Sequence, residues 1–570
     1  MSNTPNALAI GPTSLPRVDL RAPDDVMRLA RMGSAFPTRL SFMRSLLRHL
    51  AGAQAVVRRT LWEMNDDGFG RAVYQVRWDE HVYSLVAFST DLPEDKRTDR
   101  VIAEAWDTSY VLFDGVPGDD DLERLAANAP SQEAGRFRES DLILSRANKS
   151  VRLVSHVIER LASGRQPDIE QVRAIGYLMR TTAVYGNGKF GIADRAVVAD
   201  RRGLEGPFAA EMLLVWLIRG FTHDLVEHMA QRRNPEMFVP LDKQLKRFLG
   251  IGNATGLGMA PFLVSHPILL NNWIMARETA LARVQALTSA SPETIARAQH
   301  LLARLERHLE QWSVDDERQM RRIETLRLEI PELRAWLTDD WWQAPNPWAR
   351  LLAQSQAYST ECQELIISLV LEPHGDLIDD LVHSMASAVE PRLVPAMRVD
   401  ELGRHLQEAF RFALEIDFSE SSQTAQFWYV SEEKLEPRLG LRDQEDGADL
   451  EMPLDIARQV QAVARDLATA DPSETVAAFL LRHPQHRYAV TRVQTVAEHP
   501  YSEIRDNLIA VTCLPIDMLR LKLSFFGASK FDPRSDRWTR ITLYQGAPLF
   551  DELSPEVADD WWMPTLDKAL

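Results

Sequence analysis

Residues 248–267 read FLGIGNATGLGMAPFLVSHP, and this glycine-rich stretch lies between a basic, aromatic segment and a long helical pattern. Its glycines stand at positions 250, 252, 256 and 258, with small polar residues between them. Glycine lets successive backbone N–H groups point into one concavity, where an anion can bind. We predict a loop whose backbone and polar groups bind a carboxylate or phosphate, with Asn253, Thr255 and Gly256 in contact with it. A tight loop beneath packed helices is the alternative interpretation.

Two residues after the loop extend this hypothesis. His266 is the last residue but one of the stretch, and an imidazole titrates near neutral pH, which suits proton transfer. Arg277 follows in the helical pattern, and a guanidinium group binds carboxylates and phosphates through paired hydrogen bonds. The glycine spacing does not match the dinucleotide-binding or P-loop motifs, so no cofactor is assigned.

Composition limits the classes of function. The chain has 570 residues, enough for roughly two to four domains, and a formal net charge of -17. This charge disfavours broad binding to nucleic acid or to an anionic membrane, because such binding needs a basic face. Two cysteines, Cys362 and Cys513, cannot make a disulfide framework. Without a secretory signal or a membrane-length apolar run, we predict a cytoplasmic protein, with a homo-oligomer left open.

The hydrophobic periodicity changes twice along the chain. Alternating runs at 71–78 and 81–88 predict a β-hairpin, and period-two runs return at 488–496, 508–513 and 538–544. Between them the period is helical. We predict an α+β, mainly helical protein, with a large central helical region flanked by small antiparallel sheets at the N- and C-terminal ends. The predicted units are an irregular arm at 1–20, a helix with β-structure at 21–118, a helical region at 119–440, and an α/β region at 441–570.

Several helices of the central region have clear sequence signals. Ser291 followed by Pro292 predicts a helix start, with serine as N-cap and proline in the first turn. Helices are also predicted over 139–163, 167–181 and 346–371.

A second polar cluster is LSRANKSVR at 144–152. On a helix, Ser145, Asn148, Lys149 and Arg152 share one face, whereas Arg146 lies off it. This face lacks acidic residues, so we predict that Asn148 and Lys149 bind an anionic substrate. A solvated helix face is the alternative.

A third cluster is MRTTAVYGNGKFG at 179–191. A helix C-cap and turn would explain its glycines, but not the accumulation of basic and hydroxyl side chains beside them. We predict Arg180 and Asn187 as substrate-binding residues, and Tyr185 and Lys189 as catalytic ones.

Glu361 and Glu364 share one face of the predicted helix at 346–371. We predict them as catalytic acid/base groups, with salt bridges to arginines as the alternative. The chain lacks the His-Glu-x-x-His pattern, and no metal site is predicted.

Together these clusters predict that the three segments around 145, 185 and 255 converge on one site. The first hypothesis is an enzyme that acts on a small anionic metabolite by acid/base chemistry, as a lyase or hydrolase. The alternatives are a nucleotide- or phosphate-dependent ligase or transferase, and a non-catalytic helical scaffold.

Overall fold

A computed structural model provides the structure of this protein. It describes residues 19–34, 38–78, 80–91, 107–129, 138–150, 152–181, 198, 200–206, 208–256, 266–313, 317–385, 391–417, 426–431, 436–440, 452–453, 456–505, 508–509, 515–527, 530–533, 538–544 and 566–567.

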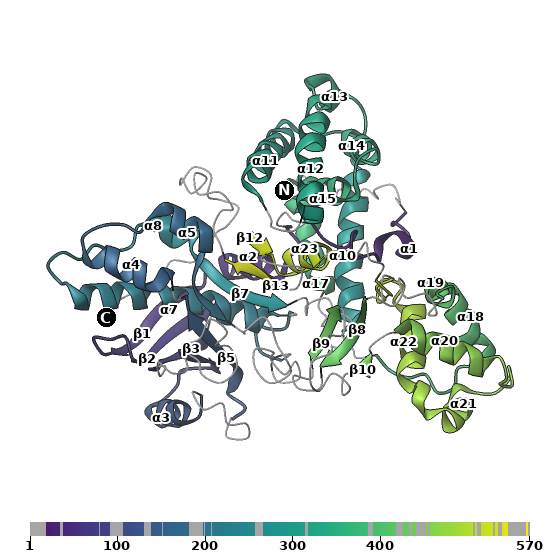
Figure 1. Cartoon of the computed structure of the whole chain (residues 1–570), viewed down its shortest axis with the longest axis horizontal. Helices are drawn as coiled ribbons and strands as arrows, with labels where there is room; N and C mark the ends of the chain where they lie inside the picture. The colour runs from purple at the N-terminus through teal and green to yellow at the C-terminus, as the bar shows by residue number, and fades with distance from the viewer. Residues whose placement is uncertain are drawn as a thin grey trace, which may run out of the picture.

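One mixed sheet of ten strands organises half of the molecule (Figure 1). Its order is β12-β13-β7-β6-β5-β4-β3-β2-β1-β14. Only the β6–β7 and β1–β14 pairs are parallel. The strands of this sheet are β1 Val56–Met64, β2 Gly70–Trp78, β3 His81–Ser89, β4 Thr108–Asp114, β5 Asp141–Lys149, β6 Tyr177–Thr181, β7 Gly250–Gly256, β12 Lys530–Pro533, β13 Trp538–Leu543 and β14 Leu566–Asp567.

A second sheet is small. It joins β8 Gln426–Ser431 with β9 Glu436–Gly440, β10 Met452–Pro453 and β11 Leu508–Ile509.

The predicted arrangement of small sheets at both ends is wrong, because strands from both ends of the chain belong to the same sheet. The C-terminal strand β13 pairs with β7, and β14 pairs with β1. Strand period identifies which face of a strand is buried, but it does not identify the partner strand. The predicted hairpin is confirmed, since β2 and β3 pair antiparallel from Gly70↔Ser89 to Trp78↔His81.

Three predicted elements have the other secondary structure in whole or in part. The helix predicted over 167–181 ends at Ile175, and residues 177–181 form strand β6. The single helix predicted over 139–163 is a strand, β5, followed by a helix from Leu153 to Ala162. In the apolar run at 142–144, Leu142 and Ile143 are buried and Leu144 is partly buried, and a short apolar run of this kind is compatible with either a strand or a helix. The predicted strand at 488–496 is a helix from Arg487 to Glu498, which buries Val490, Val493 and Val496 at helical spacing.

The helices of the described ranges are α1 Pro23–Val26, α2 Phe42–Gly52, α3 Asp119–Asn128, α4 Leu153–Ala162, α5 Ile169–Ile175, α7 Ala209–Arg233, α8 Lys243–Phe248, α10 Pro267–Gln285, α11 Pro292–Gln311, α12 Glu317–Trp336, α13 Asp339–Gln343, α14 Pro347–Ser355, α15 Thr360–Leu371, α16 Gly375–Ile378, α17 Val382–Met385, α18 Val399–Ala409, α19 Arg411–Leu414, α20 Ile456–Leu467, α21 Val476–Arg482, α22 Arg487–Glu498 and α23 Pro515–Phe526, with 3₁₀ turns η2 Asp379–Leu381 and η5 Pro484–His486. Helix α11 begins as predicted, because the Ser291 side chain accepts a hydrogen bond from the Thr294 N–H. None of the helices in these ranges is both long enough and apolar enough to cross a bilayer.

The two faces of the main sheet have different covers. Helix α7 packs against β3, β5, β6 and β7, and its apolar residues belong to the largest core. Helix α3 covers the opposite face of β2–β4, where Leu122 and Leu125 pack on Phe88 and Val111.

Two helical groups lie beyond the sheet (Figure 1). Helix α10 packs against α14, α15, α16 and α17, and α11 and α12 complete this bundle. Helices α18–α22 share a separate apolar core, and we call them the C-terminal helical group. The predicted domain limits stay a prediction.

Candidate functional site

Parts of the three polar segments, residues 144–149, 179–181 and 250–256, lie on adjoining strands. Asn148 in β5 pairs with Arg180 in β6, and Arg180 pairs in turn with Gly252 in β7. The segments therefore lie side by side, although they are strands where we predicted helices and a loop.

Strand geometry changes which side chains of the β5 segment share a face. In a strand successive side chains point to opposite faces, so Arg146 and Asn148 lie on one face and Ser145 and Lys149 on the other. The predicted helix face is therefore wrong. Side chains directly opposite on paired strands also share a face, which adds Arg180 to Arg146 and Asn148. We call these three residues the arginine face.

The arginine face lies on the same side of the sheet as α3. Arg146 pairs with Ser109 in β4, and Ser109 pairs with Phe88, which packs under α3. The α3 core reaches only as far as Leu144 in β5. The polar residues therefore begin where the apolar cover of α3 ends.

Burial shapes the electrostatics of this face. Arg146 is half-buried, and this burial lowers the pKa of its guanidinium group to about 10. Asn148 is 9% exposed. Its Oδ1 atom is buried and accepts no hydrogen bond from the described residues. The face thus combines partly desolvated positive charge with a buried amide.

Lys149 is turned toward different neighbours. Its Nζ atom lies 3.5 Å from Ser89 Oγ and 5.4 Å from the centre of the Phe69 ring. Its backbone N–H donates to Asp107 Oδ2 at 2.7 Å. Strand period therefore separates Lys149 from Asn148, although the two are adjacent in sequence, and its predicted substrate-binding role stays a prediction.

The glycine stretch is a strand through Gly256 and not a loop. Its residues pair with β13, from Ile251↔Leu543 to Gly256↔Trp538. The backbone of residues 250–256 therefore takes part in a sheet ladder, and the predicted anion contact of Asn253, Thr255 and Gly256 stays a prediction. Packing explains why glycine occupies position 252, because a Cβ atom there would lie 2.6 Å from the Tyr177 ring.

Several predicted residues are placed only in part. Asn253 and Thr255 lie in β7, and their backbones pair with Ile541 and Thr539. Tyr185, Asn187 and Lys189 lie outside the described residues. His266 immediately precedes α10, and Arg277 lies in the middle of that helix, about 16 Å further along its axis.

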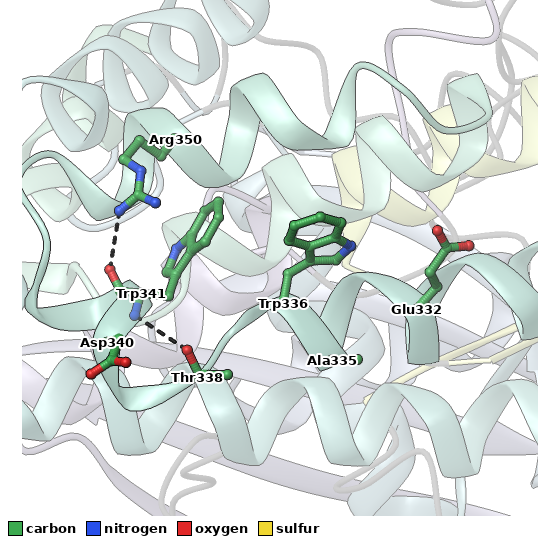
Figure 2. A pocket seen from close by; sticks show the side chains of 7 residues that line it. All are labelled: Glu332, Ala335, Trp336, Thr338, Asp340, Trp341 and Arg350. Carbon is green, nitrogen blue, oxygen red and sulfur yellow. Dashed lines mark hydrogen bonds between the residues drawn. The ribbon is translucent and has the colours of Figure 1, made fainter.

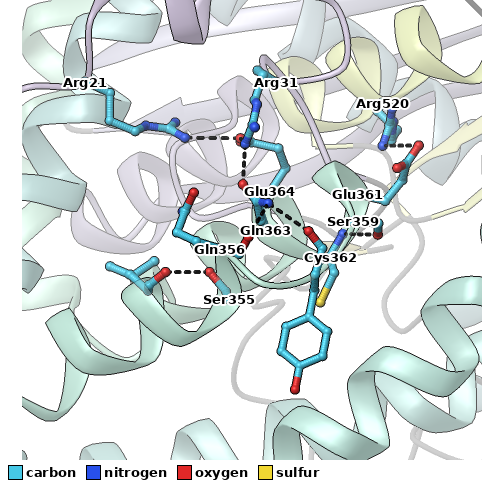
Figure 3. Close-up of polar contacts among 12 residues, drawn as sticks. Arg21, Arg31, Ser355, Gln356, Ser359, Glu361, Cys362, Gln363, Glu364 and Arg520 are labelled. Atoms are coloured by element: carbon cyan, nitrogen blue, oxygen red, sulfur yellow. Dashed lines mark hydrogen bonds and ion pairs between the residues drawn. The ribbon is translucent and has the colours of Figure 1, made fainter.

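Arg277 and Glu364 meet in a buried ion-pair network. Figure 3 shows Arg21 and Arg31 beside Glu364. Glu364 is 0% exposed and also accepts a hydrogen bond from Arg21 Nη1 at 3.1 Å. Arg31 Nη1 lies 3.6 Å from the same carboxylate, and Arg21 additionally pairs with Glu278 at 2.7 Å. Burial lowers the pKa of Arg21, but the carboxylates of Glu364 and Glu278 raise it above its ordinary value overall.

Glu361 is one turn from Glu364 and has separate partners. Arg322 Nη1 donates to its carboxylate at 2.9 Å, and Arg520 Nη1 lies 3.3 Å away. The space beside it is about 10 Å³, room for about one water. Both glutamates form the salt bridges to arginines that were the alternative interpretation, and their acid/base roles stay a prediction.

A larger surface hollow lies in the helical bundle (Figure 2). Its volume is about 620 Å³, and Trp336, Trp341 and Arg350 are among its lining residues. The Arg350 guanidinium group lies 4.2 Å from the centre of the Trp341 ring, and Trp336 is 52% exposed. This hollow contains none of the residues predicted from the sequence.

The residue that the sequence interpretation misplaced is Arg146. Helical spacing places Arg146 off the face that contains Asn148, so it was not predicted as a binding residue. Strand spacing places it on the same face as Asn148. The residues from Leu144 to Asn148, LSRAN, do not alternate regularly between apolar and polar, so the sequence contained no clear strand signal at this point.

Comparison with known proteins gives no match to a family model, a curated protein or a solved structure.

Proposed function

We propose that this protein binds a small anionic metabolite, a carboxylate or a phosphate ester, at the arginine face of the main sheet. The observation that carries the proposal is the register of β5 and β6, which places Arg146, Asn148 and Arg180 on one face of adjoining strands. Strands hold side chains more precisely than loops do, so the two guanidinium groups are well positioned to act together.

Charge and burial support an anionic ligand. A half-buried guanidinium group loses hydration, which is why the pKa of Arg146 is lowered. A bound anion would add charge-assisted hydrogen bonds to this guanidinium group, each contributing about 1.5–3 kcal/mol. Two arginines on adjoining strands can contact two oxygens of one carboxylate or phosphate.

Asn148 narrows the ligand class. A buried amide oxygen without a donor is unfavourable by about 1–3 kcal/mol. A hydroxyl group on the ligand would donate to Asn148 Oδ1 while the anionic group contacts the arginines. We therefore propose a hydroxy acid or a sugar phosphate in preference to a simple anion.

The residues proposed for the chemical step are Tyr185 and Lys189, which follow β6 in the chain, together with His266, Glu361 and Glu364. Each of the two glutamates contacts at least two arginines, so a purely structural salt-bridge role is the alternative for them.

The test is ligand binding by variants of the arginine face. Differential scanning fluorimetry and calorimetry with L-malate, glycerol 3-phosphate and inorganic phosphate would measure binding to the wild type. We expect R146M and R180M each to raise the dissociation constant roughly thirtyfold, equivalent to about 2 kcal/mol. The matched control is R77M, which removes an exposed arginine from β2 of the same sheet.

The same screen decides between the alternatives. A shift in melting temperature with ATP or GTP and magnesium alone would favour the ligase or transferase. If none of the ligands bind, or if R146M and R180M bind them as the wild type does, the anion site is rejected. Loss of binding confined to R146M and R180M supports it.

A further inference from the structure

Two imidazoles face one carboxylate in the C-terminal helical group, far in sequence from the arginine face. His486 Nε2 lies 2.6 Å from Asp466 Oδ2, and His483 Nδ1 lies 3.3 Å from the same oxygen. One ligand atom from each of the three residues lies within 4.8 Å of the others. Two imidazole nitrogens and a carboxylate oxygen are common ligands of divalent transition metals.

The local sequence explains why both imidazoles point the same way. His483 is the C-cap residue that follows α21, and Pro484 begins the 3₁₀ turn that ends at His486. In a 3₁₀ turn, side chains three residues apart are nearly aligned. Asp466 lies in the last turn of α20, so three backbone elements contribute to the group.

An aromatic ring holds both imidazoles from one side. The Phe479 ring centre lies 4.8 Å from that of His483 and 6.0 Å from that of His486. The ring of Phe479 is nearly parallel to that of His486, at 10°. Such packing restricts the ring orientations before any ion binds, which lowers the cost of assembling a site.

The burial of the group is graded. His486 is 7% exposed at its side chain, whereas His483 is 28% and Asp466 is 37% exposed. An ion can therefore enter from the side of His483 and Asp466, while His486 and Phe479 form the inner wall.

A single histidine–carboxylate hydrogen bond between α20 and η5 is the simpler interpretation. It accounts for His486, but it does not account for a second imidazole directed at the same oxygen. Metal–ligand bonds of about 2.0–2.2 Å place tetrahedral ligand atoms about 3.3 Å apart. The pair at 3.3 Å already has this spacing, and the pair at 2.6 Å needs to open by less than 1 Å.

We infer that Asp466, His483 and His486 form a binding site for one divalent transition-metal ion of the zinc class. Three protein ligands leave at least one coordination position for water, in contrast to a closed four-ligand structural site. The site is separate from the arginine face, so each proposal is tested without the other.

The experiment uses the full chain after treatment with EDTA and dialysis. Zn²⁺ binding is followed by calorimetry, and Co²⁺ binding by its visible absorption. We expect one ion per chain for the wild type. H483Q and D466N should each weaken binding at least tenfold. Both changed side chains are partly exposed, and circular dichroism verifies that the variants fold.

Two control variants distinguish this site from adventitious binding. H300Q removes an exposed histidine from α11. H405Q removes a histidine of the same helical group that has carboxylates 3.6 and 4.0 Å away. Both should bind one ion as the wild type does. Zn²⁺ should also raise the melting temperature of the wild type and of both controls, but not that of D466N.

The inference is overturned if the wild type binds no ion. It is also overturned if H483Q and D466N bind as tightly as the wild type, or if H405Q alone loses binding.

Discussion

At the scale of single residues, the most constrained charge is that of Glu364. Its carboxylate is fully buried and contacts guanidinium groups from Arg21, Arg31 and Arg277. Removing one partner of a buried ion pair leaves the remaining charges without compensation, which typically costs about 3–5 kcal/mol. The network joins α10 and α15 to the segments on both sides of α1, which contain Arg21 and Arg31.

We expect E364Q to lower the free energy of unfolding by about 3–5 kcal/mol, measured by urea denaturation. The control is E170Q, which removes the exposed partner of Arg173 and should change the same quantity by less than about 1 kcal/mol. Equal effects of the two variants would contradict a stabilising role for the buried network.

The burial of His374 should make the free energy of unfolding of this protein depend on pH. It is buried beside Trp348, with ring centres 4.8 Å apart, and burial lowers its pKa from 6.5 to about 4. Asp376 opposes this shift only in part. Between these two pKa values the unfolded chain binds more protons than the folded one, so stability rises with pH. The contribution of His374 is complete above pH 6.5 and is lost as the pH falls toward 4.

The measurement is the free energy of unfolding at a series of pH values for the wild type and H374Q. Between pH 6.5 and 4 the wild type should lose about 3 kcal/mol more than the variant does. Parallel pH profiles for the two proteins would show that His374 titrates normally in the folded state.

At the scale of elements, β7 links strands from distant parts of the chain. It lies between β6 and β13, and the Tyr177 ring occupies the space next to Gly252. We expect G252A to lower the free energy of unfolding by about 1–3 kcal/mol, because the added methyl group requires the ring to move.

The matched control is G403A in α18, where an added Cβ atom meets no atom within 4 Å. Alanine is favoured over glycine inside a helix, so G403A should raise the free energy of unfolding by about 0.5–1 kcal/mol. Thermal or urea unfolding of both variants measures the contrast, and destabilisation by G403A or neutrality of G252A would argue against this packing.

Element prediction from the sequence succeeded where local signals were strong. The hairpin of β2 and β3 alternates regularly around an acidic turn, and Ser291-Pro292 marks the start of α11. It failed at β5, where a short apolar run is compatible with both structures, and this error moved Arg146 to the wrong face. Period alone also could not distinguish α22 from a strand, since Val490, Val493 and Val496 are interspersed with polar residues.

At the scale of the whole molecule, the sheet depends on pairings between distant residues. Val57 pairs with Leu566, and Gly252 pairs with Thr542. No local signal in the sequence indicates such partners, which is why one sheet was predicted as two. The same limitation hid the group of Asp466, His483 and His486, because a helix end and a turn meet there only in the folded chain.

A chain that ends at Gly527 tests this dependence. It lacks β12, β13 and β14, and it exposes the edges of β7 and β1. Exposed strand edges pair with other chains, so we expect aggregation in size-exclusion chromatography and loss of cooperative unfolding. A monomeric truncated protein with the melting temperature of the full chain would refute the importance of these strands.

The pairing of β7 with β13 has a consequence for synthesis on the ribosome. Residues 250–256 leave the exit tunnel long before residues 538–543 are translated. The Met27 carbonyl accepts a hydrogen bond from the Arg505 N–H, and these two residues are separated by an even longer part of the chain. Until then the β7 edge remains open, and contacts between distant residues form slowly. We expect nascent chains to depend on chaperones during this interval, and the native sheet to close only near the end of translation.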